Sequence, residues 1–142
     1  MKKILYTVSI ILLLGTMSAY ADIIVITNSE ANVTAIGQNE IKDIYTGKKT
    51  VWDDGSKITF FMLEAGQTQD EFLQKFVNKS QLQYSNFWRR ELFLGKAASM
   101  PPTCKTMDEM IQKVSTTPNS IGYISSEKDI SGANVKKIQI IR

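Results

Sequence analysis

The sequence predicts a mixed α/β domain, and two observations support this fold class. Apolar runs rich in β-branched residues alternate with segments whose apolar positions have helical spacing. The first such run, 23–27 (Ile-Ile-Val-Ile-Thr), ends at Asn28 and predicts a buried strand, which indicates a sheet covered on both faces. The expected order is strand, helix, strand, three helices and two strands, an α/β arrangement of a mixed sheet flanked by helices.

Capping residues bound the predicted helices. The four expected helices cover 37–47, 66–77, 80–94 and 106–114. Gly47 and Gly95 are typical of the left-handed residue that ends a helix, and Ser80 is a favourable N-cap. Thr106-Met107-Asp108-Glu109 has the form of a capping box. The other expected strands cover 58–62, 121–124 and 135–141, with a turn at 52–55.

The N-terminal segment has the three parts of a secretory signal. It has lysines at 2–3, an apolar run over 4–14, and small residues at Ala19 and Ala21. The apolar run is shorter than the roughly 20 residues that a spanning helix needs. We therefore expect a signal peptide over residues 1–21, cleavage before Asp22, a single periplasmic domain over 22–142, and no membrane insertion after cleavage.

Composition narrows the function classes. The whole chain has a formal charge of +3, which falls to +1 when the two lysines of the signal are removed, so nucleic acid is not an expected partner. Cys104 is the only cysteine, which excludes an intrachain disulfide. It lies in a proline-flanked segment, and we expect a partly buried, inert thiol.

Few residues offer catalytic chemistry. The chain has no histidine, which excludes Ser-His-Asp triads and histidine metal sites. The segment 125–128 has the Ser-x-x-Lys spacing in which a lysine can activate a serine. It follows a predicted strand as a charged segment, so we expect a solvated loop instead. Asp53 and Asp54 favour a tight turn over a metal site, and Arg89 and Arg90 favour a solvated helix surface over an anion clamp. We expect no enzyme activity, cofactor or metal.

Several segments together resemble a known family. They are 41–48 (Ile-Lys-Asp-Ile-Tyr-Thr-Gly-Lys) with Trp52 after it, 64–72, 84–95 and 117–123 (Thr-Pro-Asn-Ser-Ile-Gly-Tyr). The chain resembles the phosphate-type periplasmic solute-binding proteins of ABC transporters, and more closely their short, single-lobe relatives, over residues 23–123. The resemblance implies one lobe of a type II periplasmic binding protein-like fold.

The resemblance also implies where a ligand is bound. In the family, two lobes close on an anion, and a Ser-Gly-Thr turn before a helix, with an arginine ahead of it, holds phosphate. The matching stretch here implies Gly66, Gln67, Thr68 and Gln69 as ligand-binding residues. The arginine is missing and Glu64 stands near its place, which argues against phosphate. An anion or a small polar solute is the expected ligand.

Two functions remain open from the sequence. The first is an exported, non-enzymatic binding module with its ligand at Gly66–Gln69. The second is an envelope interaction or adaptor protein that docks a protein partner, or a homodimer, without a small-molecule ligand. Under both, Trp52, Trp88, Tyr45 and Tyr84 are expected in the core or on packed helix faces.

Overall fold

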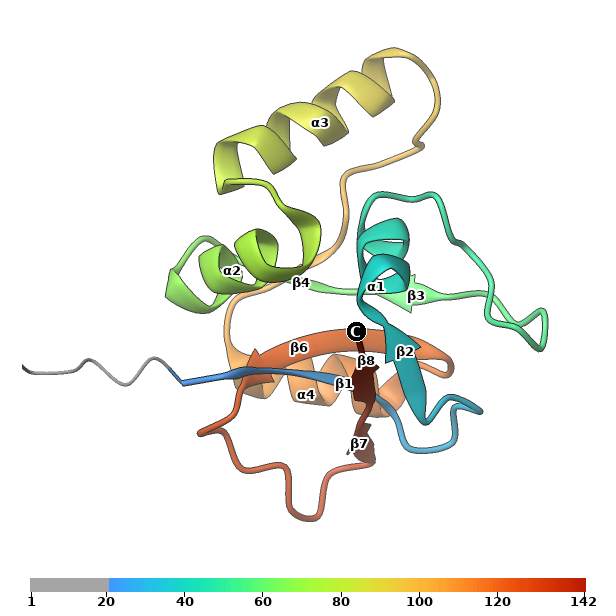
Figure 1. Cartoon of the computed structure of the whole chain (residues 1–142), viewed down its shortest axis with the longest axis vertical. Coiled ribbons are helices and arrows are strands. Elements are labelled where there is room, and N and C mark those ends of the chain that lie inside the picture. Colours follow the sequence, from blue (N-terminus) through green and yellow to red (C-terminus); the bar gives the residue numbers. More distant parts are fainter. Residues whose placement is uncertain (1–20) are drawn as a thin grey trace, which may run out of the picture.

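The main sheet of the computed structural model, which describes residues 21–142, has four strands in the order β3-β6-β1-β7 (Figure 1). The central strand β1 (Ile23–Asn28) is antiparallel to β6 (Ser120–Ser125) and to β7 (Val135–Lys137). Strand β3 (Thr59–Phe60) is parallel to β6. The predicted mixed sheet is confirmed. Residues 1–20 of the predicted signal peptide lie outside the described residues.

Two shorter sheets correct the predicted strand boundaries. Strand β2 (Ala35–Gly37) pairs in parallel with β8 (Gln139–Ile141), and β4 (Met62–Leu63) pairs in parallel with β5 (Thr103–Cys104). The sequence pattern predicted neither β2 nor β5. Each of these pairs contains a strand that continues directly from a strand of the main sheet.

The prediction of one strand at 58–62 and one at 135–141 is wrong, because each of these runs divides between two sheets. The Phe61 N–H donates to Ile121 O, but the next N–H, of Met62, donates to Pro102 O. Likewise the Ile138 N–H donates to Val25 O, whereas the Gln139 N–H donates to Thr34 O. The chain changes its hydrogen-bonding partner within one residue, which an apolar run does not reveal.

The four predicted helices are confirmed. They are α1 (Gln38–Tyr45), α2 (Gln67–Phe72), α3 (Gln81–Phe93) and α4 (Met107–Thr116). Gly47 follows α1 with a φ of +76°, in the left-handed region expected of a glycine after a helix. Ser80 Oγ accepts from the Gln83 N–H at 3.2 Å, so Ser80 is the N-cap of α3. Helix α2 continues as a π-helical turn, η1 (Leu73–Val77), which the sequence did not predict.

Helices cover both faces of the main sheet, as predicted. A Cβ added to Gly122 of β6 would lie 2.5 Å from Met110 Sδ of α4. The next residue, Tyr123, stacks on Phe72 of α2 with ring centroids 3.7 Å apart. Successive residues of a strand point to opposite faces. Helices α4 and α2 therefore lie on opposite sides of β6.

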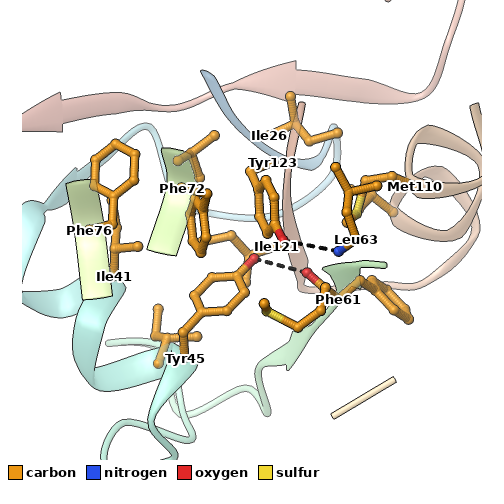
Figure 2. Close-up of a cluster of buried hydrophobic side chains, with 14 of the residues drawn as sticks. Ile26, Ile41, Tyr45, Phe61, Leu63, Phe72, Phe76, Met110, Ile121 and Tyr123 are labelled. Carbon is orange, nitrogen blue, oxygen red and sulfur yellow. Dashed lines mark hydrogen bonds between the residues drawn. The ribbon is translucent and has the colours of Figure 1, made fainter. Parts of the chain in front are cut away.

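Two tyrosines in the core satisfy their hydroxyl groups with backbone partners (Figure 2). The Tyr45 hydroxyl donates to Phe61 O at 3.2 Å, and the Tyr123 hydroxyl accepts from the Leu63 N–H at 3.0 Å. Burial raises the pKa of both tyrosines well above the ordinary value. Both hydroxyls tie the sheet and helices to the segment that leads into α2.

The four aromatic residues assigned to packing are buried, which confirms that assignment: Tyr45, Trp52, Tyr84 and Trp88. Cys104 is also fully buried, and burial raises the pKa of its thiol to about 11. A protonated, buried thiol reacts slowly, as the inert interpretation requires. Among the residues described, no helix has the length and apolar character needed to span a membrane.

Replacing Thr106 by alanine should destabilise the protein by about 0.5–2 kcal/mol. Thr106 Oγ1 accepts from the Glu109 N–H at 3.1 Å, which confirms the predicted N-cap of α4. The capping box itself is incomplete, because Glu109 Oε2 accepts from the Lys105 N–H and not from the N–H of Thr106. Urea denaturation measures the loss. Thr50→Ala, at an exposed position outside the helices, is the control and should leave the midpoint unchanged.

Candidate functional site

The N-terminus of α2 carries backbone donors without helical partners. The helix begins at Gln67, separated from the end of β4 by residues 64–66, and exposed Gly66 is its N-cap. The Asp70 N–H donates to Gly66 O at 3.0 Å, which is the first hydrogen bond of the helix. The amides of Gln67, Thr68 and Gln69 precede it and have no intrahelical acceptor. Such amides can receive an acceptor group of a ligand.

The structure separates the four predicted ligand-binding residues. Gln67 and Thr68 line a hollow of about 300 Å³, here called the α2 hollow, together with Ala21, Glu71, Met107, Ser125 and Glu127. Gln69 instead lines a second cavity of about 350 Å³. Gly66 contributes the turn between β4 and α2. The four residues are adjacent in sequence but do not face one common space.

Among the described residues, those that line the α2 hollow include carboxylates and no cation. Glu71 and Glu127 are among its lining residues, which include no lysine or arginine. The nearby Lys128 ammonium pairs with Asp108 Oδ1 at 2.6 Å. Gln67 Nε2 donates to Glu71 Oε1 at 2.9 Å. A phosphate dianion placed here would meet two carboxylates and no buried counter-charge.

Gln69 has a structural role through the Nε2 atom of its side chain. Its side chain is only 7 % exposed, and Nε2 donates to Leu63 O at 2.9 Å. This hydrogen bond connects α2 to the end of β4. Its Oε1 is buried and makes no hydrogen bond within residues 21–142. Gln69 Nε2 therefore stabilises the turn, whereas Gln69 Oε1 is a buried acceptor without a donor within residues 21–142.

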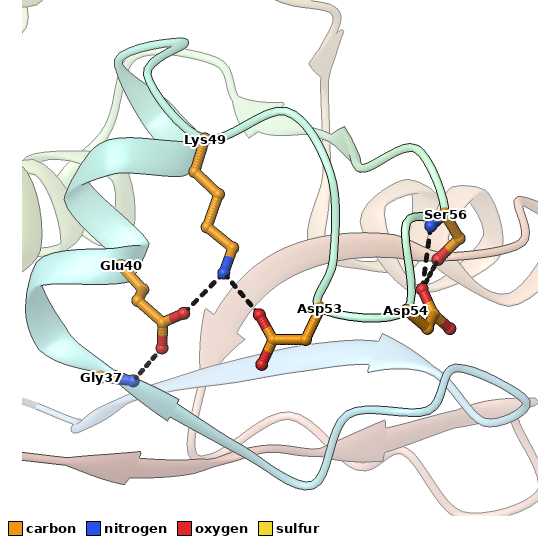
Figure 3. A network of polar contacts seen from close by, with 6 residues as sticks. All are labelled: Gly37, Glu40, Lys49, Asp53, Asp54 and Ser56. Carbon is orange, nitrogen blue, oxygen red and sulfur yellow. Dashed lines mark hydrogen bonds and ion pairs between the residues drawn. The ribbon is translucent and has the colours of Figure 1, made fainter.

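The other candidate groups are engaged in local contacts. Lys49 Nζ binds Glu40 Oε1 at 2.7 Å and Asp53 Oδ1 at 3.1 Å, whereas Asp54 Oδ1 accepts from the Ser56 N–H and hydroxyl (Figure 3). Lys49 lowers the pKa of Glu40, aided by the Gly37 N–H, and Glu40 raises that of Lys49. Asp53 and Asp54 thus have separate partners. Over the described part of the chain, no group of three or more acidic or cysteine side chains could hold a metal ion.

The remaining sequence candidates are the Ser-x-x-Lys segment and the two arginines of α3. Lys128 binds Asp108, and Ser125 Oγ accepts from the Glu127 N–H at 3.4 Å. The Ser125 and Lys128 side chains of the Ser-x-x-Lys segment therefore contact other partners and not each other. Arg89 and Arg90 are exposed on α3, and neither forms an ion pair with any residue that the structure describes.

Sequence reasoning missed the second cavity, which we call the α3 cavity. Its walls come from β4, the loop after it, α2, α3, and β5 with the segment before it. The lining residues are Met62, Glu64, Ala65, Gln69, Gln81, Tyr84, Ser85, Trp88, Met100, Pro101 and Thr103. These segments are separated in sequence and share no motif. Trp88 and Tyr84, assigned only to packing, also line this cavity. No local pattern could have identified it.

Comparison with known proteins places the chain in a family. The family model described as a PBP superfamily domain matches residues 16–140, and the chain belongs to this family. The match covers nearly the whole chain and confirms the resemblance found in the sequence. The comparison with curated proteins gave no match.

The chain is similar to several solved structures. A putative phosphate ABC transporter substrate-binding protein with bound phosphate from Clostridium perfringens is 22 % identical with a TM-score of 0.63, and matches 84 % of this chain and 45 % of its own. An ABC-type phosphate transport receptor from Vibrio cholerae is 20 % identical, with a TM-score of 0.65, and matches 84 % of this chain and 46 % of its own. PstS from Borrelia burgdorferi has the same identity and TM-score, with 84 % and 47 % covered.

These similarities establish the fold. The chain spans less than half the length of each of these three structures. It therefore has the fold of one lobe of such a protein, which confirms the predicted fold class. A closed site between two lobes needs a second lobe, which residues 21–142 do not supply.

Proposed function

We propose that this protein is an exported, non-enzymatic binding module that holds a small polar solute or small anion at the N-terminus of α2. The observation that carries the proposal is the pair of amides, of Gln67 and Thr68, that lack intrahelical acceptors in residues lining the α2 hollow. Family membership supports a binding role. The signal-like pattern of residues 1–21 supports export to the periplasm.

The charges around the α2 hollow favour one class of ligand. Glu71 and Glu127 repel a multiply charged anion, and no lining cation compensates. An uncharged solute, or a singly charged anion, can give an acceptor to the α2 amides at lower electrostatic cost. Affinity should be in the high-micromolar range or weaker, because one lobe leaves the ligand half exposed.

Titration calorimetry of two variants tests this proposal. Thr68→Val removes the hydroxyl donor and should weaken binding of the preferred solute, measured against phosphate, sulfate, acetate and glucose. Glu71→Gln removes a carboxylate from the hollow and should strengthen binding of the anions, because repulsion falls.

Matched controls separate local from general effects. Glu30→Gln makes the same charge change at an exposed, distant position, and Thr50→Val makes the same hydroxyl-to-methyl change away from α2. Neither should alter affinity. If all four compounds give flat titrations with every variant at millimolar concentration, the α2 site is rejected.

A second candidate function is docking of a protein partner. Four apolar side chains on α3 and in the segment after it are exposed: Leu82 (67 %), Phe93 (90 %), Leu94 (53 %) and Met100 (43 %). Helix α3 lies away from the main sheet, at the top of Figure 1. Exposed apolar surface of this kind favours contact with an envelope protein or a second copy of the chain. Flat titrations would favour this function over the first.

A further inference from the structure

We propose that the α3 cavity is a second binding site, for a small uncharged amphipathic solute that carries a hydrogen-bond donor and an acceptor on an apolar body. The cavity lies between α3, the β4–α2 loop and the segment before β5. It shares no lining residue with the α2 hollow. The inference is therefore independent of the function proposed for the N-terminus of α2.

Two buried polar atoms without partners mark this cavity. Gln69 Oε1 and Trp88 Nε1 are the buried side-chain polar atoms for which the structure of residues 21–142 shows no hydrogen bond. Both side chains are 7 % exposed, and both residues line the α3 cavity. Leaving a buried polar group without a partner costs free energy. Both atoms belong to residues that line one cavity, so a shift of either side chain would present the atom to a partner held inside that cavity.

The surroundings of each atom show whether it lacks a donor or an acceptor as its partner. Gln69 uses its donor, Nε2, on Leu63 O at 2.9 Å, so only its acceptor is free. Trp88 Nε1 can only donate. The neighbouring Tyr84 hydroxyl donates to Tyr45 O at 2.6 Å. The Trp88 indole lies beside the Tyr84 ring, with centroids 6.3 Å apart, and a contact between the two side chains opposes the rise in the pKa of Tyr84 that burial causes. Within residues 21–142, Trp88 Nε1 makes no hydrogen bond of full geometry.

The size and lining of the cavity define the rest of the ligand. A volume of about 350 Å³ lies in the range of small-molecule sites. Met62, Ala65, Met100 and Pro101 give it apolar walls. Its lining includes no lysine or arginine, and Glu64 supplies a carboxylate, so an anion is disfavoured.

These features select the chemical class of the ligand. Gln69 Oε1 requires a donor, and Trp88 Nε1 requires an acceptor. An amide attached to an aliphatic or aromatic body has both groups and no charge. The apolar body would replace water along the methionine and proline walls.

The indole N–H signals in a ¹H–¹⁵N correlation spectrum report directly on the proposed site. Titration with N-acetyl-L-leucinamide should move the Trp88 indole signal downfield, because its N–H gains an acceptor. The Trp52 signal is an internal reference, since Trp52 Nε1 already donates to Asn119 O at 3.0 Å. N-acetyl-L-leucine keeps the N-acetyl amide but has a carboxylate in place of the terminal carboxamide. It should bind more weakly, because Glu64 repels the carboxylate.

Two variants assign the contacts. Trp88→Phe removes the indole donor, and Gln69→Met removes the acceptor at similar side-chain length. Each should weaken binding of N-acetyl-L-leucinamide about five- to tenfold, as expected for one hydrogen bond. In Trp88→Phe the indole signal is lost, so the backbone amide signals of Ser85 and Thr103 report the titration. Gln69→Met also loses the hydrogen bond to Leu63 O. If that loss impairs folding, the comparison of Trp88→Phe with the unaltered protein decides the test.

Two control variants test whether the effect is specific to the α3 cavity. Gln112→Met, at an exposed position of α4, should leave the affinity unchanged. Thr68→Val should also leave it unchanged, so failure of the α2 site would not affect this result. An unmoved Trp88 signal at millimolar amide, or equal affinity of Trp88→Phe and the unaltered protein, would overturn the proposal.

Discussion

Replacing Phe72 by alanine should lower the free energy of unfolding by about 3–5 kcal/mol. Phe72 is fully buried, stacks on Tyr123 at 3.7 Å, and meets the edge of Tyr45 at 4.7 Å between ring centroids. It connects α2 to β6 and to α1, so its removal leaves a cavity where three elements meet. Chemical denaturation monitored by circular dichroism gives the loss.

Phe93→Ala is the matched control for that substitution. The Phe93 side chain is 90 % exposed near the end of α3, so the same truncation removes little packing. Its effect should stay within about 0.5 kcal/mol. Equal effects of the two substitutions would show that Phe72 is not a central contact of the core.

Replacing Trp88 by alanine should have an effect of similar size, about 3–5 kcal/mol, but on a different part of the molecule. Helix α3 buries only Tyr84 and Trp88. Trp88 Cη2 would lie 3.2 Å from a Cβ added to Gly47, and its ring lies near Phe60 and Phe87. Loss of this side chain should release α3 from the rest of the fold.

Hydrogen exchange of the amides of α3 distinguishes this local release from general unfolding. In the Trp88→Ala variant these amides should exchange much faster, while those of β1 and β6 remain the slowest in the molecule. Leu82→Ala, at a 67 % exposed position of the same helix, should leave α3 protected. Unchanged protection of α3 in Trp88→Ala would mean that other contacts hold the helix.

Features set by neighbouring residues could be predicted from the sequence. Ser80 and Thr106 cap helices through atoms three residues away, and Gly47 takes a left-handed conformation that its type permits. The strand breaks near Phe61 and Ile138 depend on which distant strand lies alongside. A pattern of apolar residues contains no information on that choice, so those boundaries were missed.

The candidate sites divide in the same way. The turn at Gly66–Gln69 could be predicted because a family resemblance marks it, and its amides need only the helix that follows. Thr68 lines the α2 hollow and Gln69 lines the α3 cavity, and this division depends on distant segments, which are the end of β6 for the hollow and α3 for the cavity. The pairing of Gln69 with Trp88 in one cavity joins residues from two helices, and the sequence shows no relation between them.

The position of β1 in the sheet has a consequence for the order in which the chain can fold. β1 is the first strand of the described chain, yet it pairs with β6 and β7, so Ile23 lies opposite Ser125 and Asn28 lies opposite Val135. Closing contacts over about 100 residues is entropically costly and slow. During synthesis, β1 emerges first and must wait for the C-terminal part of the chain before it has neighbouring strands. The main sheet is thus incomplete in a nascent chain until β6 and β7 have been synthesised.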